Sequence, residues 1–193
     1  MKVLPCPAGF GTPFFFWEGQ VMKKKSNLRN LILSAMFLAL ALVLPFVTGQ
    51  IPQIGAMLLP MHIPVLLCGF FCGAPWGLAV GFMAPLFRSV IFGMPPMFPT
   101  ALCMAFELAS YGLVTGFVYR IMPKRRSSVY TALILAMLMG RCIWGIAMFM
   151  CMGGDFGLEA FMAGAVTGAI PGIILQLLLI PILVIALEKV NKN

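Results

Sequence analysis

Long apolar stretches separated by short polar, glycine-rich or proline-rich breaks make up most of this 193-residue chain. All but the second are long enough for a helix that crosses a bilayer, which takes about 20 residues. The sequence therefore predicts an all-α integral membrane protein with six transmembrane helices. The predicted spans are about residues 28–47, 58–73, 75–92, 100–121, 129–152 and 163–187.

The second predicted span is short enough to be a re-entrant segment instead of a full crossing. A full crossing is favoured, because it puts every basic cluster on one side of the membrane, as in the cytoplasmic loops of membrane proteins. Both termini are then predicted to be cytoplasmic. The clusters are Lys23, Lys24, Lys25 and Arg29 before the first span, Arg120, Lys124, Arg125 and Arg126 after the fourth, and Lys189 and Lys192 after the sixth.

The composition agrees with a chain surrounded by lipid. Hydrophobic residues make up 62% of the sequence and the mean hydropathy is +1.04, whereas soluble domains are about 45–50% apolar. The net charge of +8 comes from basic residues that flank the predicted spans on one side of the membrane, so it does not indicate nucleic-acid binding. Six scattered cysteines and a single histidine predict no metal site, and the cysteines are expected to act as small buried hydrophobes.

The first 21 residues, rich in Pro, Gly and Phe, fit no span, signal peptide or helix. The codons of Trp17-Glu18-Gly19 are purine-rich and resemble a ribosome-binding site shortly before Met22. We therefore predict that residues 1–21 are a mis-called or disordered extension. Residues 22–193 are predicted to form a single six-helix membrane domain.

Ionisable residues within the predicted spans are costly in lipid and mark candidate functional positions. At 1.5 Å per residue, Glu107 lies roughly 10–13 Å below the outer face and Arg141 about 12 Å below it. The two are therefore predicted to be level and able to pair. Arg88 lies about one turn below the outer end of its span and His62 near the outer end of the second, so all four gather in the outer half.

Two interpretations stay open for the predicted pair. Glu107 and Arg141 either only neutralise each other, so that their two spans can lie in the membrane, or form the floor of a ligand pocket. In the second case Tyr111, four residues after Glu107, and Trp144, three residues after Arg141, share their helix faces and join the site.

Arg88 and His62 also have two interpretations each. Arg88 has no acid in its own span, so it is the preferred ligand anchor, with snorkelling to the outer interface as the alternative. His62 is either a ligand donor or an interfacial histidine. Two arginines and a histidine against one glutamate predict a net positive site for a carboxylate or another anionic group.

Small residues spaced four apart form a second pattern, which lets helix backbones approach closely. The glycines are predicted to pack within the chain. The alanines near the cytoplasmic end of the predicted first span pack either within the chain or against a helix of a partner protein. The pattern comprises Ala35 and Ala39, Gly77 and Gly81, and the row Ala160, Gly164, Gly168 and Gly172.

Three segments resemble one family. They are SAMFLALA, which contains Ala35 and Ala39, LPMHIPVLLCGF, and GLAVGFMAPLFRSVIFGMPPMFPTA. Together with the six-span plan, they make residues 27–187 similar to the substrate-binding S component of an energy-coupling factor (ECF) vitamin transporter. The riboflavin/pantothenate-type group is most similar, and HIPV resembles pantothenate components.

The resemblance implies a non-enzymatic capture subunit in a bacterial-type cell membrane. Such subunits bind a vitamin beneath outer loops, here residues 48–59, 93–99 and 152–161. They dock through the first-span alanines, here Ala35 and Ala39, onto a membrane coupling subunit that carries two cytoplasmic ATPases, and no cofactor is implied. The predicted outer polar residues lie beneath these loops, as the depth argument independently requires.

Two other function classes compete with capture. A membrane enzyme is disfavoured, because the sequence has no H-E-x-x-H, Walker or Ser-His motif and no paired intramembrane aspartates. A self-sufficient proton-coupled carrier that uses Glu107 remains the alternative. Pantothenate or another anionic vitamin is the expected substrate, because riboflavin calls for more stacking aromatics.

Overall fold

The computed structural model describes residues 13–123 except 48–58, residues 125–190 except 154–156 and 166–168, and the described part contains helices but no strand. Among the residues described, five helices are long and apolar enough to cross a membrane. The prediction of an all-α membrane protein is therefore confirmed, while six crossings and cytoplasmic termini stay predictions. The helices are α1 (Pro13–Val47), α3 (His62–Cys72), α4 (Ala74–Phe92), η1 (Met97–Ala101), α5 (Leu102–Ile121), α6 (Arg126–Met152), α7 (Leu158–Ala165) and α8 (Ile170–Val190).

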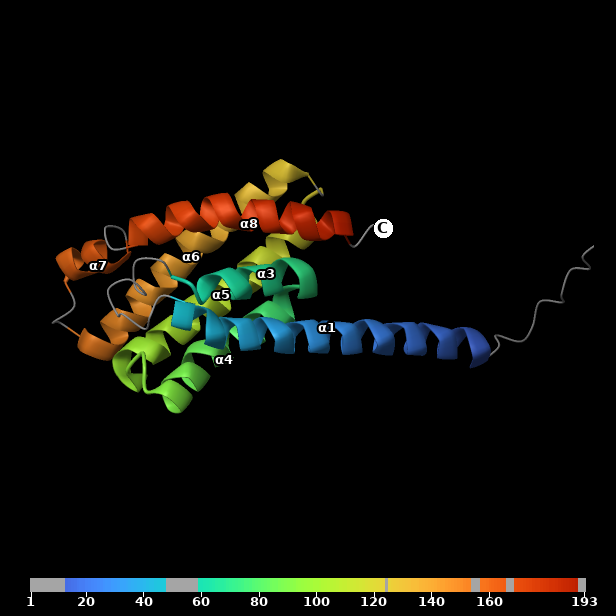
Figure 1. Cartoon of the computed structure of the whole chain (residues 1–193), viewed down its shortest axis with the longest axis horizontal. Coiled ribbons are helices and arrows are strands. Elements are labelled where there is room, and N and C mark those ends of the chain that lie inside the picture. Colours follow the sequence, from blue (N-terminus) through green and yellow to red (C-terminus); the bar gives the residue numbers. More distant parts are fainter. Residues whose placement is uncertain (1–12, 48–58, 124, 154–156, 166–168, 191–193) are drawn as a thin grey trace, which may run out of the picture.

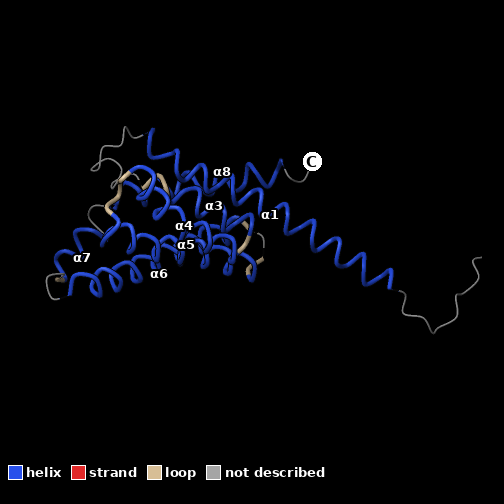
Figure 2. Tube along the Cα trace, turned by 90° about the horizontal axis from the view of Figure 1, so that it is seen from below, coloured by secondary structure: helices blue, strands red, loops and turns tan. Residues whose placement is uncertain are grey.

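The bundle is organised around α5, which contacts α3, α4 and α6. The helix α1 lies against α3 and α4, and α8 lies against α3 and α6. Figures 1 and 2 show the beginning of α1 running out beyond the other helices. This helix begins at Pro13, so the prediction of no helix before Met22 was wrong for residues 13–21. Whether the natural chain starts at Met22 stays a prediction.

The short helix α3 forms the centre of the bundle. Its 11 residues span about 16 Å, half of a ~30 Å hydrocarbon core. Ten of them are buried, because α1, α4, α5 and α8 surround the helix. Gly73 ends α3 and immediately precedes α4 with φ of 89°, a conformation that a side chain would strain. Pro75 then fits the first turn of α4, where its missing N–H costs nothing.

Glycines allow α4 and α5 to touch backbone to backbone. A Cβ on Gly77 would lie 2.6 Å from the carbonyl oxygen of Gly112, and one on Gly81 would collide with the backbone of Leu108. The prediction that Gly77 and Gly81 pack within the chain is therefore confirmed. Gly164 also packs internally, since its Cβ would meet the Trp144 ring, whereas Gly168 lies outside the described residues.

The predicted sixth span, residues 163–187, was wrong at its beginning. Ala163 lies in the separate short helix α7, and the long helix α8 starts only at Ile170. Pro171 explains the late start, because proline cannot donate to a preceding turn but is tolerated at the start of a helix. Glu159, expected in an outer loop, belongs to α7, which packs on α6 through Phe161 beside Trp144 and Gly145.

We expect Gly77→Ala to lower the stability of the protein. Alanine is the better helix former by about 1 kcal/mol, but its Cβ meets the Gly112 backbone, and overpacking costs about 1–3 kcal/mol. Thermal unfolding in detergent measures the effect. Gly157→Ala is the matched control, because a Cβ there meets nothing within 4 Å. Equal melting temperatures for the two variants would contradict the close packing of α4 on α5.

Candidate ligand-binding site

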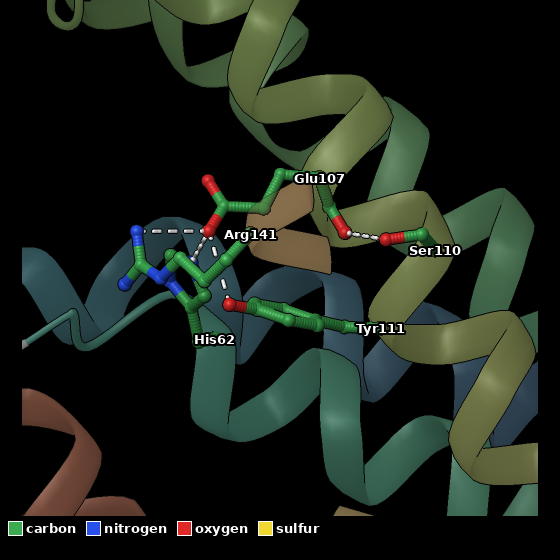
Figure 3. A network of polar contacts seen from close by, with 5 residues as sticks. All are labelled: His62, Glu107, Ser110, Tyr111 and Arg141. Carbon is green, nitrogen blue, oxygen red and sulfur yellow. Dashed lines mark hydrogen bonds and ion pairs between the residues drawn. The ribbon is translucent and has the colours of Figure 1, made fainter. Parts of the chain in front are cut away.

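The carboxylate of Glu107 is the common partner of three side chains from three helices. Its Oε1 lies 3.1 Å from Nη1 of Arg141 and accepts a 3.0 Å hydrogen bond from the hydroxyl of Tyr111. Nε2 of His62 lies 3.7 Å from the same oxygen. Figure 3 shows the guanidinium, imidazole and phenol converging on the carboxylate. Glu107 is 2% exposed, so these contacts replace water around a charge that lipid could not solvate.

The positions of these side chains follow from simple helix geometry. Tyr111 reaches Glu107 because residues four apart on a helix face the same way. His62 is the first residue of α3, and Arg141 lies midway along α6, and both helices pack on α5. The predicted pairing of Glu107 with Arg141 is confirmed. Whether the pair also forms the floor of a ligand pocket stays a prediction.

Several buried polar atoms of the bundle have no hydrogen-bond partner. Among the described residues, five buried side-chain nitrogens are unpartnered, and they belong to three residues: Nδ1 and Nε2 of His62, Nε and Nη2 of Arg141, and Nε2 of Gln176. A buried donor without a partner costs about 1–3 kcal/mol. Such atoms are expected where a ligand supplies the missing acceptors.

Arg141 presents one complete edge of its guanidinium without a partner. Nη1 pairs with Glu107, which leaves the neighbouring Nε and Nη2 donors unused on the other side. These two parallel N–H groups match the two oxygens of a carboxylate. Arg141 can therefore hold Glu107 and a second acceptor group at the same time.

Arg88 makes its contacts elsewhere. Its Nη1 donates a 3.0 Å hydrogen bond to the carbonyl oxygen of Leu42 in α1. Its guanidinium also lies 5.5 Å from the ring centre of Phe46 and 5.7 Å from that of Phe92. A cation near the C-terminal end of a helix is favoured by the helix dipole, and both rings add cation–π attraction.

The position of Arg88 changes the charge expected at the site. The described contacts of Glu107 balance one carboxylate with one guanidinium, and Arg88 is not among its ion-pair partners. The donors that remain unused are therefore those of Arg141, His62 and Gln176. The role of Arg88 as a ligand anchor stays a prediction.

Trp144 lies in the second half of α6, where it faces α7. Its ring centre is 6.4 Å from that of Phe161, and it fills the space next to Gly164. The structure thus places this predicted site residue between α6 and α7, one turn beyond Arg141. Of the predicted covering loops, residues 48–58 and 154–156 lie outside the described residues, and residues 93–99 lead into η1.

Sequence reasoning missed Gln176. The side chain is 1% exposed in α8, and its amide nitrogen has no partner. Residues 169–187 contain no other polar side chain, so a single amide in an otherwise apolar span was the available signal.

The two first-span alanines lie on the open side of α1. Both Ala35 and Ala39 are exposed, while the buried side of α1 carries Ser34, Ala41 and Pro45. Within the described residues, the two alanines are thus available to lipid or to a partner helix. Internal packing, the competing interpretation, does not apply to them.

We expect Glu107→Ala and Arg141→Ala each to lower the melting temperature more than the double substitution does. Either single change leaves an unpaired charge in a low dielectric, at a cost of about 3–5 kcal/mol, whereas the double change leaves neither charge. A double-mutant cycle by thermal unfolding in detergent measures the coupling. Strictly additive losses would show that the two charges do not depend on each other.

The comparison with known families agrees with this arrangement. The family described as ECF transporter, substrate-specific component, matches residues 29–184, a region that extends from the apolar part of α1 well into α8. No curated protein and no solved structure gives a significant match. Since the match covers well over half of the chain, the protein belongs to the family of substrate-specific components of ECF transporters.

Proposed function

We propose that this chain captures an anionic vitamin from outside the cell, with pantothenate as the first candidate, for import by an ATP-driven ECF transporter. The family supports the role of a substrate-specific transport subunit. The unpartnered Nε and Nη2 edge of Arg141 is the observation that supports an anionic ligand.

A carboxylate fits that edge better than a neutral group does. Glu107 fixes one side of the guanidinium at 3.1 Å, and the hydroxyl of Tyr111 holds the carboxylate of Glu107 in turn. The guanidinium is therefore oriented before a ligand arrives, which reduces the entropy that binding must overcome. Charge-assisted hydrogen bonds contribute about 1.5–3 kcal/mol, enough to set the position of a small ligand.

Pantothenate combines a carboxylate with an amide and two hydroxyl groups, so it can use both charged and neutral donors. His62 and Gln176 are neutral-donor candidates, because each carries a buried nitrogen without a hydrogen-bond partner. A flavin ring would need stacking partners, and Tyr111 is already engaged with Glu107 while Trp144 packs beside Phe161. The proposed ligand contacts are His62 and Arg141, with Glu107 and Tyr111 orienting the guanidinium of Arg141.

For Arg88 we propose a supporting role. Its bond to Leu42 and its contacts with Phe46 and Phe92 fasten the outer end of α1 to α4. Arg141 then takes the role of ligand anchor that the sequence suggested for Arg88. Loss of stability without loss of affinity in Arg88→Ala is the pattern that separates the two roles.

Release on the inner side is proposed to require partner subunits. The exposed Ala35 and Ala39 leave a shallow strip on α1 that a helix of a coupling subunit can enter, and that subunit would carry two cytoplasmic ATPases. The alternative, a self-sufficient proton-coupled carrier, would need Glu107 to take up and release a proton, and to separate from Arg141, in each cycle. Uptake by this chain in cells that lack any coupling module would support that alternative.

We expect Arg141→Lys to weaken pantothenate binding about 10- to 100-fold while the protein stays folded. Lysine keeps the charge opposite Glu107 but loses the two parallel donors. Isothermal titration in detergent gives the affinity. Panthenol, in which an alcohol replaces the carboxylate, should bind weakly to wild-type protein and be affected little by the substitution.

The control for this titration is Arg120→Lys, an exposed arginine at the end of α5. It should bind pantothenate like the wild type. Wild-type affinity in Arg141→Lys would remove Arg141 from the proposed ligand contacts, and equal affinity of the wild type for panthenol would remove the carboxylate as the recognised group.

We expect the double variant Ala35→Leu/Ala39→Leu to keep ligand binding but lose assembly with the coupling subunit and ATP-driven uptake. Both side chains are exposed, so the added bulk blocks the strip without disturbing the bundle. Co-purification and uptake assays on cells with the coupling module measure the loss. Ala186→Leu, an exposed alanine of α8, is the control. Normal assembly of the double variant would exclude this docking surface.

A further inference from the structure

We propose that Gln176 is a further substrate-binding residue, whose side-chain amide donates to a carbonyl or hydroxyl oxygen of the ligand held by Arg141. The proposal rests on the proposed capture function and extends it to a second recognition point on α8. It also defines the substrate class more narrowly, as a molecule with a neutral acceptor oxygen in addition to its carboxylate.

The first observation is the state of the Gln176 side chain. It is 1% exposed, and its Nε2 has no hydrogen-bond partner. An amide in this position would be unfavourable in a purely structural role, because an apolar side chain of similar shape would avoid the desolvation cost. The unpartnered Nε2 of Gln176 is explained if a ligand accepts its hydrogen bond.

The second observation is the position of Gln176 relative to one core cluster. Leu66, Tyr111, Met137 and Ile180 all belong to the same cluster of buried side chains. Each of them lies four residues, or one helical turn, from a polar residue on its own helix. The four polar residues, which we call the polar layer, are His62, Glu107, Arg141 and Gln176.

The direction of the chain places all members of the polar layer on the same side of the cluster. The helices α3, α5 and α8 run one way along the bundle axis, and α6 runs the opposite way (Figure 1). On the first three helices the polar residue precedes its cluster member, and on α6 it follows, as with Arg141 after Met137. Gln176 therefore lies on the same side of the cluster as His62, Glu107 and Arg141.

The third observation is that α8 packs on the two helices that carry the other unpartnered donors. It contacts α3, which carries His62, and α6, which carries Arg141. Unused donors thus come from α8 and from the two helices that it contacts. When Arg141 binds the carboxylate of a ligand, the Gln176 amide can donate a hydrogen bond to a second oxygen of the same ligand.

The test compares wild-type protein with Gln176→Met, which keeps the length of the side chain but removes the donor. Each protein is incubated with pantothenate, and binding is measured by isothermal titration. Native mass spectrometry then records any small molecule that each protein retains from the cell. We expect about three- to tenfold weaker binding, or a matching loss of retained ligand, in Gln176→Met. The melting temperature without ligand should be unchanged or higher.

A second variant guards against a packing effect. Thr115→Val also replaces a buried polar side chain, but the Thr115 hydroxyl already donates within α5. It should leave ligand binding unchanged. Equal ligand binding by wild-type protein and Gln176→Met would overturn the role of Gln176 while capture stands. A wild-type protein that neither binds pantothenate nor retains any small molecule would overturn the capture function, and this inference with it.

Discussion

A buried carboxylate in a membrane bundle must be neutralised and hydrogen-bonded, and this requirement on Glu107 determines how α3, α5 and α6 meet. Arg141 supplies the opposite charge at 3.1 Å and Tyr111 a hydrogen bond at 3.0 Å, while His62 lies at 3.7 Å. These partners come from α3, α5 and α6, so the pairing fixes the relative depth of three helices. It also orients the guanidinium whose opposite edge is unused.

Two kinds of contact hold the bundle together. Glycines let α4 and α5 touch through their backbones, at Gly77 with Gly112 and at Gly81 with Leu108, and an apolar cluster fills the centre. Polar side chains beside this packing form the second kind of contact, and a bound molecule can complete their missing hydrogen bonds. The capture proposal thus follows from one layer of the fold, while the exposed strip of α1 remains available for a partner.

Parts of this arrangement were predictable from the sequence because they depend on helical periodicity alone. The rise of 1.5 Å per residue was sufficient to place Glu107 level with Arg141, and the four-residue spacing placed Tyr111 beside Glu107. Other features depend on contacts that no spacing encodes. Arg88 finds a backbone carbonyl of α1, an acceptor that every residue offers and no sequence pattern singles out. The break before α8 and the burial of Gln176 likewise depend on how distant helices pack.

The most direct test of this account is an experimental structure of the purified protein with its retained or added small molecule. The account predicts two ligand oxygens within about 2.7–3.2 Å of Nε and Nη2 of Arg141 while Nη1 keeps its contact with Glu107. A ligand bound away from Arg141, with the same edge of the guanidinium filled by a protein group, would contradict it.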